Sequence, residues 1–256
     1  MLIPPHSLIG RFLHRRSVAR WRASTAAVGD TQTGDLDTQV QMAKRMARRI
    51  RDFQAEAAAK LALPRPGSST FPRPAGTDWS WRPKPWRMAC PELGLSPALP
   101  KDNVTNELLI FHDCKSREIT LRLTRNTRYI DLSPYGTTLE VFHFDGSYLS
   151  LVIEVPPASC EGLRKNHLIR LATVITRERP TKIYARLNVK HGPNTEQILL
   201  TLPDEEDAFV EFDLAYSQLI EAQAERMWID LLIEDPNMNK ITFRDLNLSR
   251  YPRAEI

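Results

Sequence analysis

The stretch "KIYARLNVKHGPNTEQILLTL", residues 182–202, carries the pattern from which we predict the fold. In its first half apolar residues alternate with polar ones, which is the period of a strand with one buried face. An apolar run resumes after the Gly-Pro-Asn sequence, so we predict a hairpin whose connection is residues 191–194. His191 has no recognisable base or nucleophile beside it, so we expect no catalytic role for it. The apolar members of the first half are Ile183, Ala185, Leu187 and Val189.

The same two-residue period continues from Leu108 to the end of the sequence. Short apolar runs such as "REITLRLTR", "SYLSLVIEV" and "MWIDLLIED" recur there, and turn-forming pairs such as Asp145-Gly146 and Asp235-Pro236 separate them. No helical crossover connects the runs, although "SQLIEAQAERM" between two of them is compatible with a helix. The pattern predicts a mainly β fold for residues 106–256, an antiparallel β-sandwich of the jelly-roll type or a barrel.

The N-terminal part predicts a basic helical arm over residues 1–62. The net charge of +4 is mild, but five arginines precede the first acidic residue, Asp30. A first helix is expected over about residues 7–21 and a second over about residues 35–62, with Asp35 as its N-cap. Apolar and small residues of the second helix, with Gln54 as a polar member, recur in alternating steps of four and three, which places them on one stripe. They are Leu36, Val40, Ala43, Ala47, Ile50, Gln54, Ala57 and Leu61.

The arginines of this arm are candidates for contact with an anionic partner, such as a membrane surface or an acidic protein. They comprise Arg11, Arg15, Arg16, Arg20 and Arg22 in the first helix and Arg45, Arg48 and Arg49 in the second. The apolar stripe fits packing on the protein's own body or on a partner helix, and it also fits a membrane surface. Nucleic acid fits less well because no helix-turn-helix pattern accompanies the helix.

Residues 63–105 are rich in proline, which removes backbone donors and fixes φ, so neither a helix nor a central strand is expected. Four aromatic residues in this segment, Phe71, Trp79, Trp81 and Trp86, are too apolar for a freely solvated tether. We therefore predict an extended strap that lays its aromatic side chains onto the following domain.

The sequence lacks the common signatures of cofactor, metal and catalytic sites. It has no glycine-rich phosphate loop, no Gly-x-Ser-x-Gly elbow and no His-Glu-x-x-His motif. His112 and Cys114 alternate onto one strand face, but a structural zinc site needs four ligands and no second pair follows. The acidic run of residues 204–207 lacks the spacing of a calcium loop. We predict no catalytic residue, no cofactor and no metal, and therefore a protein that is not an enzyme.

Three widely spaced cysteines, Cys90, Cys114 and Cys160, form no Cys-x-x-Cys pair, which favours reduced thiols in a cytoplasm-like compartment. Arg11 interrupts the apolar stretch near the N-terminus, so we predict no secretory signal. No stretch approaches the roughly 20 apolar residues of a membrane span, so we predict none. The acid-free N-terminus leaves an organelle transit peptide as an alternative. The expected location is the cytoplasm, free or peripheral to the membrane.

Two predicted strands carry a set of residues suited to sugars. The polar side of "KIYARLNVK" shows Tyr184, Arg186 and Asn188, and one side of "MWIDLLIE" shows Trp228 and Asp230. If the strands are neighbours in one sheet, these side chains form a patch for sugar hydroxyls and for the C–H face of a sugar ring. The alternative is that Arg186 and Asp230 form an ordinary ion pair on a solvated sheet face.

Two segments carry a resemblance to known families. "FDGSYLSLVIEVP" (144–156) and "MWIDLLIEDPNMNKITFRDLNLSRYPRAEI" (227–256) are similar to strands of jelly-roll domains of the carbohydrate-binding-module type, also called galactose-binding-like. The whole chain, including "FPRPAGTDWSWRP" and "ARLNVKHGPNTEQ", resembles an uncharacterised alphaproteobacterial protein family of unknown function. The first resemblance implies a sandwich that binds a glycan, and the second implies a bacterial protein without indicating an activity.

These observations predict a non-catalytic binding protein that holds a glycan or polysaccharide-related ligand on a jelly-roll sheet face. The alternative is a structural or adaptor protein that docks on a membrane surface or protein partner through the basic helices. An enzyme ranks third, and it would require His112, Cys114 or His191 beside a carboxylate in a deep cleft. The sequence does not indicate the ligand or the oligomeric state.

Overall fold

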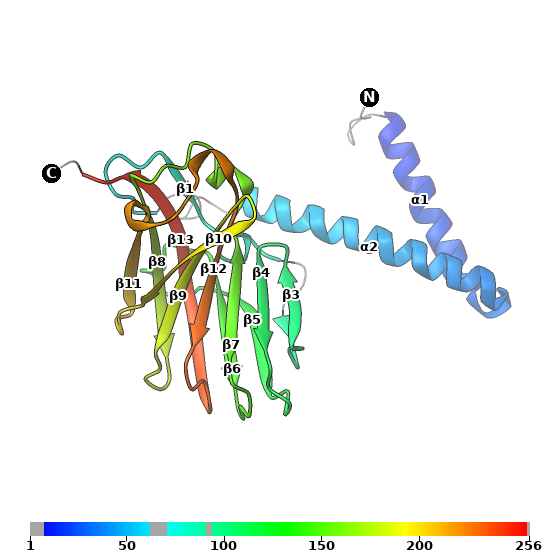
Figure 1. The fold of residues 1–256 in the computed structure, drawn as a ribbon. Helices are drawn as coiled ribbons and strands as arrows, with labels where there is room; N and C mark the ends of the chain where they lie inside the picture. Colours follow the sequence, from blue (N-terminus) through cyan, green and yellow to red (C-terminus); the bar gives the residue numbers. More distant parts are fainter. Residues whose placement is uncertain (1–7, 62–70, 91–93, 255–256) are drawn as a thin grey trace. The chain divides into compact units, whose positions relative to one another are not determined.

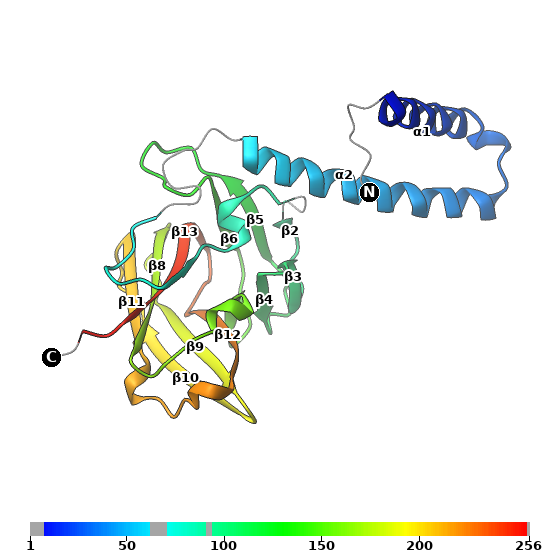
Figure 2. The same ribbon diagram turned by 90° about the horizontal axis from the view of Figure 1, so that it is seen from above.

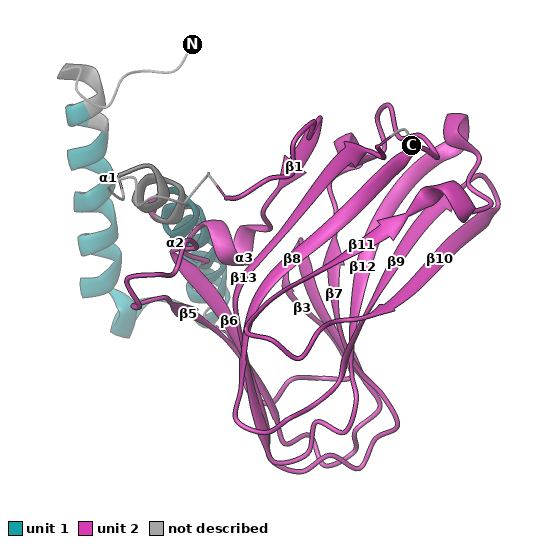
Figure 3. Cartoon of the chain, turned by 90° about the vertical axis from the view of Figure 1, so that its left-hand side faces the viewer, with its two compact units in different colours: residues 1–53 teal, residues 54–256 magenta. Residues whose placement is uncertain are grey.

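The computed structural model describes residues 8–61, 71–90 and 94–254. The chain divides into two compact units, residues 1–53 and residues 54–256 (Figure 3). The first unit holds the helix α1 (Leu8–Ala26), the 3₁₀ turn η1 (Val28–Asp30) and most of the helix α2 (Thr33–Leu61). The second unit contains every β-strand that the structure describes (Figure 1).

Both N-terminal helices differ at their ends from the sequence prediction. The helix α1 continues five residues beyond position 21, through Ala23 and Ala26, because alanine favours the helix. The helix α2 begins at Thr33, so Asp35 lies in its first turn and is not the N-cap. A carboxylate in the first turn is still favourable, since it faces the positive end of the helix dipole. No helix within the described residues is long and apolar enough to cross a membrane.

The second unit is a sandwich of two antiparallel sheets (Figures 1 and 2), which confirms the predicted fold class. The seven-stranded sheet has the order β11-β8-β13-β6-β5-β2, with β1 paired to β13, and the six-stranded sheet has the order β10-β9-β12-β7-β4-β3. The chain passes repeatedly from one sheet to the other, so most pairings join segments far apart in the sequence. The strands are β1 (Trp79–Trp81), β2 (Gly94–Leu95), β3 (Lys101–Thr105), β4 (Leu108–His112), β5 (Ile119–Arg125), β6 (Tyr135–Val141), β7 (Leu149–Glu154), β8 (His167–Arg177), β9 (Ile183–His191), β10 (Asn194–Thr201), β11 (Asp207–Asp213), β12 (Ala224–Ile233) and β13 (Asn239–Pro252).

The core lies between the two sheets. The inward side of β9 carries Ile183, Ala185, Leu187 and Val189, all buried, as the alternation of the sequence predicts. The hairpin prediction is also confirmed. His191 pairs with Asn194, and Gly192 and Pro193 form the connection between β9 and β10. Gly192 has a φ of 56°, a left-handed conformation that glycine adopts without steric cost.

The described part of the proline-rich segment, residues 71–90 and 94–105, lies on the sandwich, as predicted, but it is more regular than the sequence suggests. Trp86 is fully buried, and its indole Nε1 donates a hydrogen bond of 2.8 Å to the carbonyl of Phe243. The strand β1 pairs with β13 of the seven-stranded sheet, and a four-residue helix, α3 (Lys84–Arg87), follows it. Prolines do not prevent either element, because β1 contains none and Pro85 stands in the first turn of α3. The strands β2 and β3, within residues 94–105, already pair with the sandwich.

The segment "SQLIEAQAERM" does not form an α-helix. Two short 3₁₀ turns, η3 (Leu214–Tyr216) and η4 (Glu221–Gln223), lie at this point of the chain, and β12 begins at Ala224. Leu219 is buried in the core and Ile220 is exposed, so the segment does not present a continuous apolar helix face.

Candidate functional site

The structure brings the five predicted ligand-binding residues together on one face of the six-stranded sheet. The strands β9 and β12 are neighbours, with Asp230 opposite Arg186 and Trp228 opposite Asn188, and Tyr184 lies two residues further along β9. Residues that alternate with these five point into the core, so the five lie on the opposite, outer side of the sheet. We call these five residues the polar sheet face.

The centre of the polar sheet face is a buried carboxylate. The side chain of Asp230 is 7% exposed, and its Oδ2 accepts hydrogen bonds from Arg186 Nε at 2.8 Å and from Asn188 Nδ2 at 3.0 Å. Arg186 Nη2 approaches the same oxygen at 2.7 Å. The pair is therefore more than a solvated surface ion pair, because the guanidinium and the amide together compensate a charge that lies out of water.

A further residue, Gln197 on β10, extends this network and was not selected from the sequence. Its Nε2 donates a hydrogen bond of 3.0 Å to Asn188 Oδ1, and Asn188 itself is fully buried. The signal was available in the hairpin, since the pairing of His191 with Asn194 also sets Asn188 opposite Gln197.

The aromatic members of the polar sheet face are half-buried. The Tyr184 hydroxyl donates to Glu234 Oε2 at 3.1 Å. The guanidinium of Arg226 lies 4.9 Å from the centre of the Trp228 ring, a cation–π distance, and it also forms an ion pair with Glu154. Both rings are thus oriented by charged neighbours while part of each remains accessible.

A buried hydroxyl lies on the same outer face, on β7. Ser150 is 5% exposed and is paired between Leu232 on β12 and Phe111 on β4. Its Oγ has no hydrogen-bond partner among the residues that the structure describes. Such a group carries a desolvation cost of roughly 1–3 kcal/mol.

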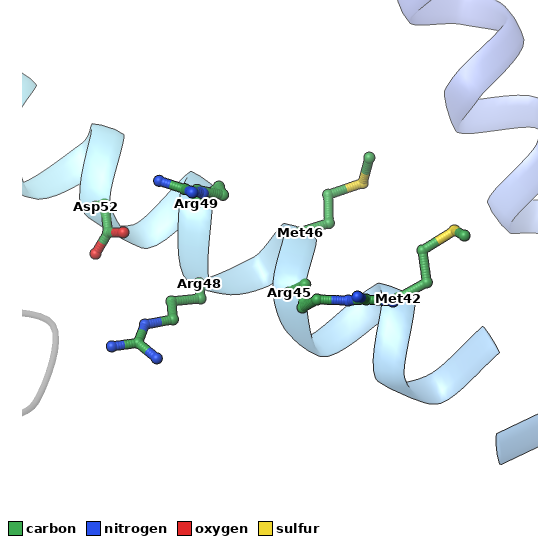
Figure 4. A pocket seen from close by; sticks show the side chains of 6 residues that line it. All are labelled: Met42, Arg45, Met46, Arg48, Arg49 and Asp52. Atoms are coloured by element: carbon green, nitrogen blue, oxygen red, sulfur yellow. The ribbon is translucent and has the colours of Figure 1, made fainter. Parts of the chain in front are cut away.

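The predicted basic contact residues lie in a different part of the chain. All eight are exposed, five on α1 and three on α2. Arg45, Arg48 and Arg49 help to line a hollow of about 780 Å³ whose walls come from α2 alone (Figure 4). Because one helix supplies every lining residue, this feature is an open surface along the helix and not an enclosed pocket.

The side chains considered as metal ligands or catalytic residues, those of His112, Cys114 and His191, are buried or form hydrogen bonds with the backbone. His112 is buried, and its Nδ1 accepts a hydrogen bond of 3.2 Å from the Cys114 amide. His191 is buried as well, and its Nδ1 accepts from the Ile220 amide at 3.4 Å. Over residues 8–61, 71–90 and 94–254, no three His, Cys, Asp or Glu side chains gather in a way that could hold a metal ion.

A further pocket, with a volume of about 330 Å³, lies within the second unit. Its polar wall is built around Asp131, whose side chain is 2% exposed and lies between Arg128 at 3.2 Å and Arg244 at 3.3 Å. Ile130 and Leu132 form an apolar part of the lining. The sequence did not single out these residues, because they come from a loop and from the distant strand β13.

Residues 1–256 match the model of a protein family described as "Family of unknown function (DUF6478)". The chain belongs to this family. A search of the curated proteins gives no match.

Solved structures with a similar fold include carbohydrate-binding modules, as the closing strands of the sequence suggested. A family 11 module from Clostridium thermocellum is 12% identical, with 64% of this chain and 97% of that chain covered and a TM-score of 0.36. The xylan-binding domain of Paenibacillus barcinonensis Xyn10C is 8% identical, with coverage of 57% and 87% and a TM-score of 0.34. The enzymatically active domain of bacteriophage CBA120 tailspike protein 4 is 9% identical, with coverage of 63% and 22% and a TM-score of 0.40. At these identities the likeness concerns the fold alone.

Proposed function

We propose that this protein binds a glycan on the polar sheet face. The observation that carries the proposal is the buried Asp230 carboxylate, held by Arg186 and Asn188 on a face that also carries two half-buried aromatic rings. The partly exposed Arg186 guanidinium can donate to sugar hydroxyls and the Asp230 carboxylate beside it can accept from them, while the buried Asn188 amide holds that carboxylate in place. Tyr184 and Trp228 can cover the C–H face of a sugar ring.

The network that surrounds Asp230 is ordered before any ligand arrives. Arg186 has two short contacts to Asp230, and Gln197 holds the Asn188 amide in one orientation. A ligand therefore meets polar groups whose side-chain entropy has already been lost, which favours binding.

The test begins with the full-length protein on an array of bacterial and plant polysaccharides, followed by titration calorimetry with each ligand that binds. Trp228→Ala and Arg186→Ala should each weaken binding at least about tenfold, because each removes a direct contact. Trp228→Phe should retain part of the affinity, since a ring remains. Phe209→Ala is the matched control, because Phe209 is an exposed aromatic residue on β11 of the other sheet.

The assignment fails if Trp228→Ala and Arg186→Ala, shown to be folded by circular dichroism, bind every glycan as the natural protein does. It also fails if the Phe209 control loses as much affinity as the Trp228 variant. An array on which the folded protein binds nothing would overturn the glycan proposal itself.

A further inference from the structure

The helix α2 presents an apolar seam that the chain leaves open. Val40 is 41% exposed and Ile50 is 52% exposed, and Met46 and Phe53 beside them are exposed too. The seam residues follow steps of four and three, and from Leu36 to Ile50 these steps average about 3.5 residues. This is the repeat by which one helix packs along another in a coiled coil.

The same helix is charged unequally along its length. Its first turns contain Asp35 and Asp37, and its middle part, residues 44–51, contains five basic residues, all exposed, after which Asp52 and Glu56 follow. These basic residues are Lys44, Arg45, Arg48, Arg49 and Arg51. A partner helix fits this surface when it has the same charge pattern and runs in the opposite direction. The acidic first turns of each helix then lie beside the basic part of the other.

We propose that α2 pairs antiparallel with α2 of a second copy of this chain. In an antiparallel pair, setting Asp37 beside Arg51 of the second copy also sets Val40 near Ile50 and Ala43 near Ala47 of that copy. Each contact occurs twice, as two-fold symmetry requires. The alanines thus meet at the centre of the seam, and Val40 meets Ile50 toward each end. The Asp37–Arg51 ion pairs lie beside the seam.

Two Asp37–Arg51 ion pairs favour this arrangement over a parallel pair, and they outnumber the single like-charge contact that the same register makes between the two copies of Lys44. A parallel pair would place the two acidic starts together and the two basic parts together, which is unfavourable. In the antiparallel pair the residues from Leu36 to Gln54 overlap over about 27 Å, given a rise of about 1.5 Å per residue. Met46 lies near the two-fold axis, and Figure 4 shows its side chain projecting away from Arg48 and Asp52.

A membrane surface fits the same helix less well. Helices that lie on membranes carry a broad apolar face bordered by basic residues. Here the centre of the apolar face holds two alanines, Ala43 and Ala47, and Asp37 borders it. The uneven distribution of charge along α2 complements an antiparallel helix with the same distribution, whereas an anionic membrane would repel the acidic first turns.

The first experiment measures the mass of the full-length protein by sedimentation over a range of concentrations. A dimer is expected, and Val40→Asn combined with Ile50→Asn should shift it to monomer. Met42→Asn is the matched control, because Met42 is 41% exposed like Val40 but lies off the seam. A natural protein that stays monomeric, or a control that dissociates as fully as the seam variant, overturns the proposal.

The second experiment changes charge. Asp37→Arg should weaken the dimer about tenfold or more, because two attractive contacts become repulsive. Adding Arg51→Asp should restore it. If α2 instead serves a membrane, Asp37→Arg will leave the sedimentation mass unchanged and will strengthen binding to vesicles that contain phosphatidylserine, and that result overturns the proposal.

Orientation is tested by cysteine cross-linking of the folded protein under brief oxidation. Met46→Cys should form a disulfide-linked dimer, since the two copies of position 46 face each other across the axis. Val40→Cys should not, because position 40 faces position 50 of the second copy. Efficient linking through position 40 with none through position 46 would indicate a parallel pair and contradict the antiparallel arrangement.

Discussion

The Arg82 guanidinium forms two hydrogen bonds, of 2.9 and 2.7 Å, with the Asp245 carboxylate, and both side chains are buried. Arg82 belongs to the proline-rich strap and Asp245 to β13, where the pairing with β8 shifts register between Phe243 and Asp245. Burial raises the pKa of Asp245 above its ordinary value, and Arg82 opposes that rise. The ion pair thus fastens the strap to the sandwich at an irregular point of the sheet.

Arg82→Ala should lower the free energy of unfolding by roughly 3–5 kcal/mol at neutral pH, because it leaves a buried carboxylate without its counter-charge. Arg122→Ala, which removes an exposed pair with Glu140, should cost about 0–1 kcal/mol and serves as the control. Urea denaturation of the full-length variants measures both values. Equal losses in the two variants would contradict this role of the pair.

The pH dependence of the Arg82 variant has a defined sign. Without Arg82 the folded-state pKa of Asp245 rises further, so the folded protein binds a proton more readily than the unfolded chain does. Protonation removes the uncompensated charge. The loss of stability in Arg82→Ala should therefore become smaller as the pH falls from neutral toward about 4, the ordinary range for an aspartate. Urea denaturation repeated at several pH values measures this trend, and a loss that stays constant or grows as the pH falls would contradict it.

Trp86 provides the second anchor of the strap. Trp86→Phe should cost roughly 1–3 kcal/mol, because the buried Phe243 carbonyl loses its donor, and Trp86→Ala should cost roughly 3–5 kcal/mol, because a cavity also forms. Trp79→Phe is the control, since Trp79 is half-buried. Thermal unfolding followed by near-ultraviolet circular dichroism measures all three. If Trp86→Phe costs no more than Trp79→Phe, the buried hydrogen bond contributes nothing measurable.

The sequence was sufficient to place side chains on one or the other side of a strand, but not to place strands beside each other. Alternation along "KIYARLNVK" and "MWIDLLIE" put Arg186 and Asp230 on the outer side of their strands, since period two is a local property. Their direct opposition depends on the pairing of β9 with β12, a long-range contact that neither strand's own pattern specifies. The residues of the polar sheet face could therefore be selected from the sequence. Their assembly into one network could be predicted only on the assumption that the two strands are neighbours in one sheet.

For the proline-rich strap, too, the sequence predicted which residues pack on the sandwich but not which residues they contact. Its four aromatic residues predicted contact with the sandwich, and Trp86 confirms this, because a buried indole contributes a large apolar area. The partners of the strap could not be predicted, since the Phe243 carbonyl and Asp245 lie more than a hundred residues away in the sequence. Ser150 was missed for a related reason: a serine in an apolar strand gives no signal that its hydroxyl is buried without a partner among the described residues.

The hairpin between β9 and β10 offers a test of backbone strain. Gly192→Ala should cost roughly 1–2 kcal/mol, because a residue with a Cβ is disfavoured at a φ of 56°. The new Cβ would also lie 2.5 Å from Gln223 Oε1, the end of a flexible side chain that can move. Gly162→Ala is the control, since Gly162 has a φ of 67° and nothing described lies within 4 Å of the added atom. Urea denaturation measures the free energy of unfolding of the two variants. A much larger decrease for Gly192→Ala than for Gly162→Ala would mean that the Gln223 side chain cannot move away from the added Cβ.

Asp145 should titrate at unusually low pH. Hydrogen bonds from the Cys114 side chain and from the Lys115 and Ser116 amides lower the pKa of this carboxyl to about 2. The unfolded chain has the ordinary value of 3.8, so the contribution of Asp145 to stability is complete above that pH and is lost as the pH falls through about 2. Asp145→Asn should therefore flatten the dependence of the unfolding free energy on pH between these two values. Titration followed by carboxyl carbon resonances measures the pKa directly, and a value near 3.8 in the folded protein would show that the three donors do not hold the ionised carboxylate.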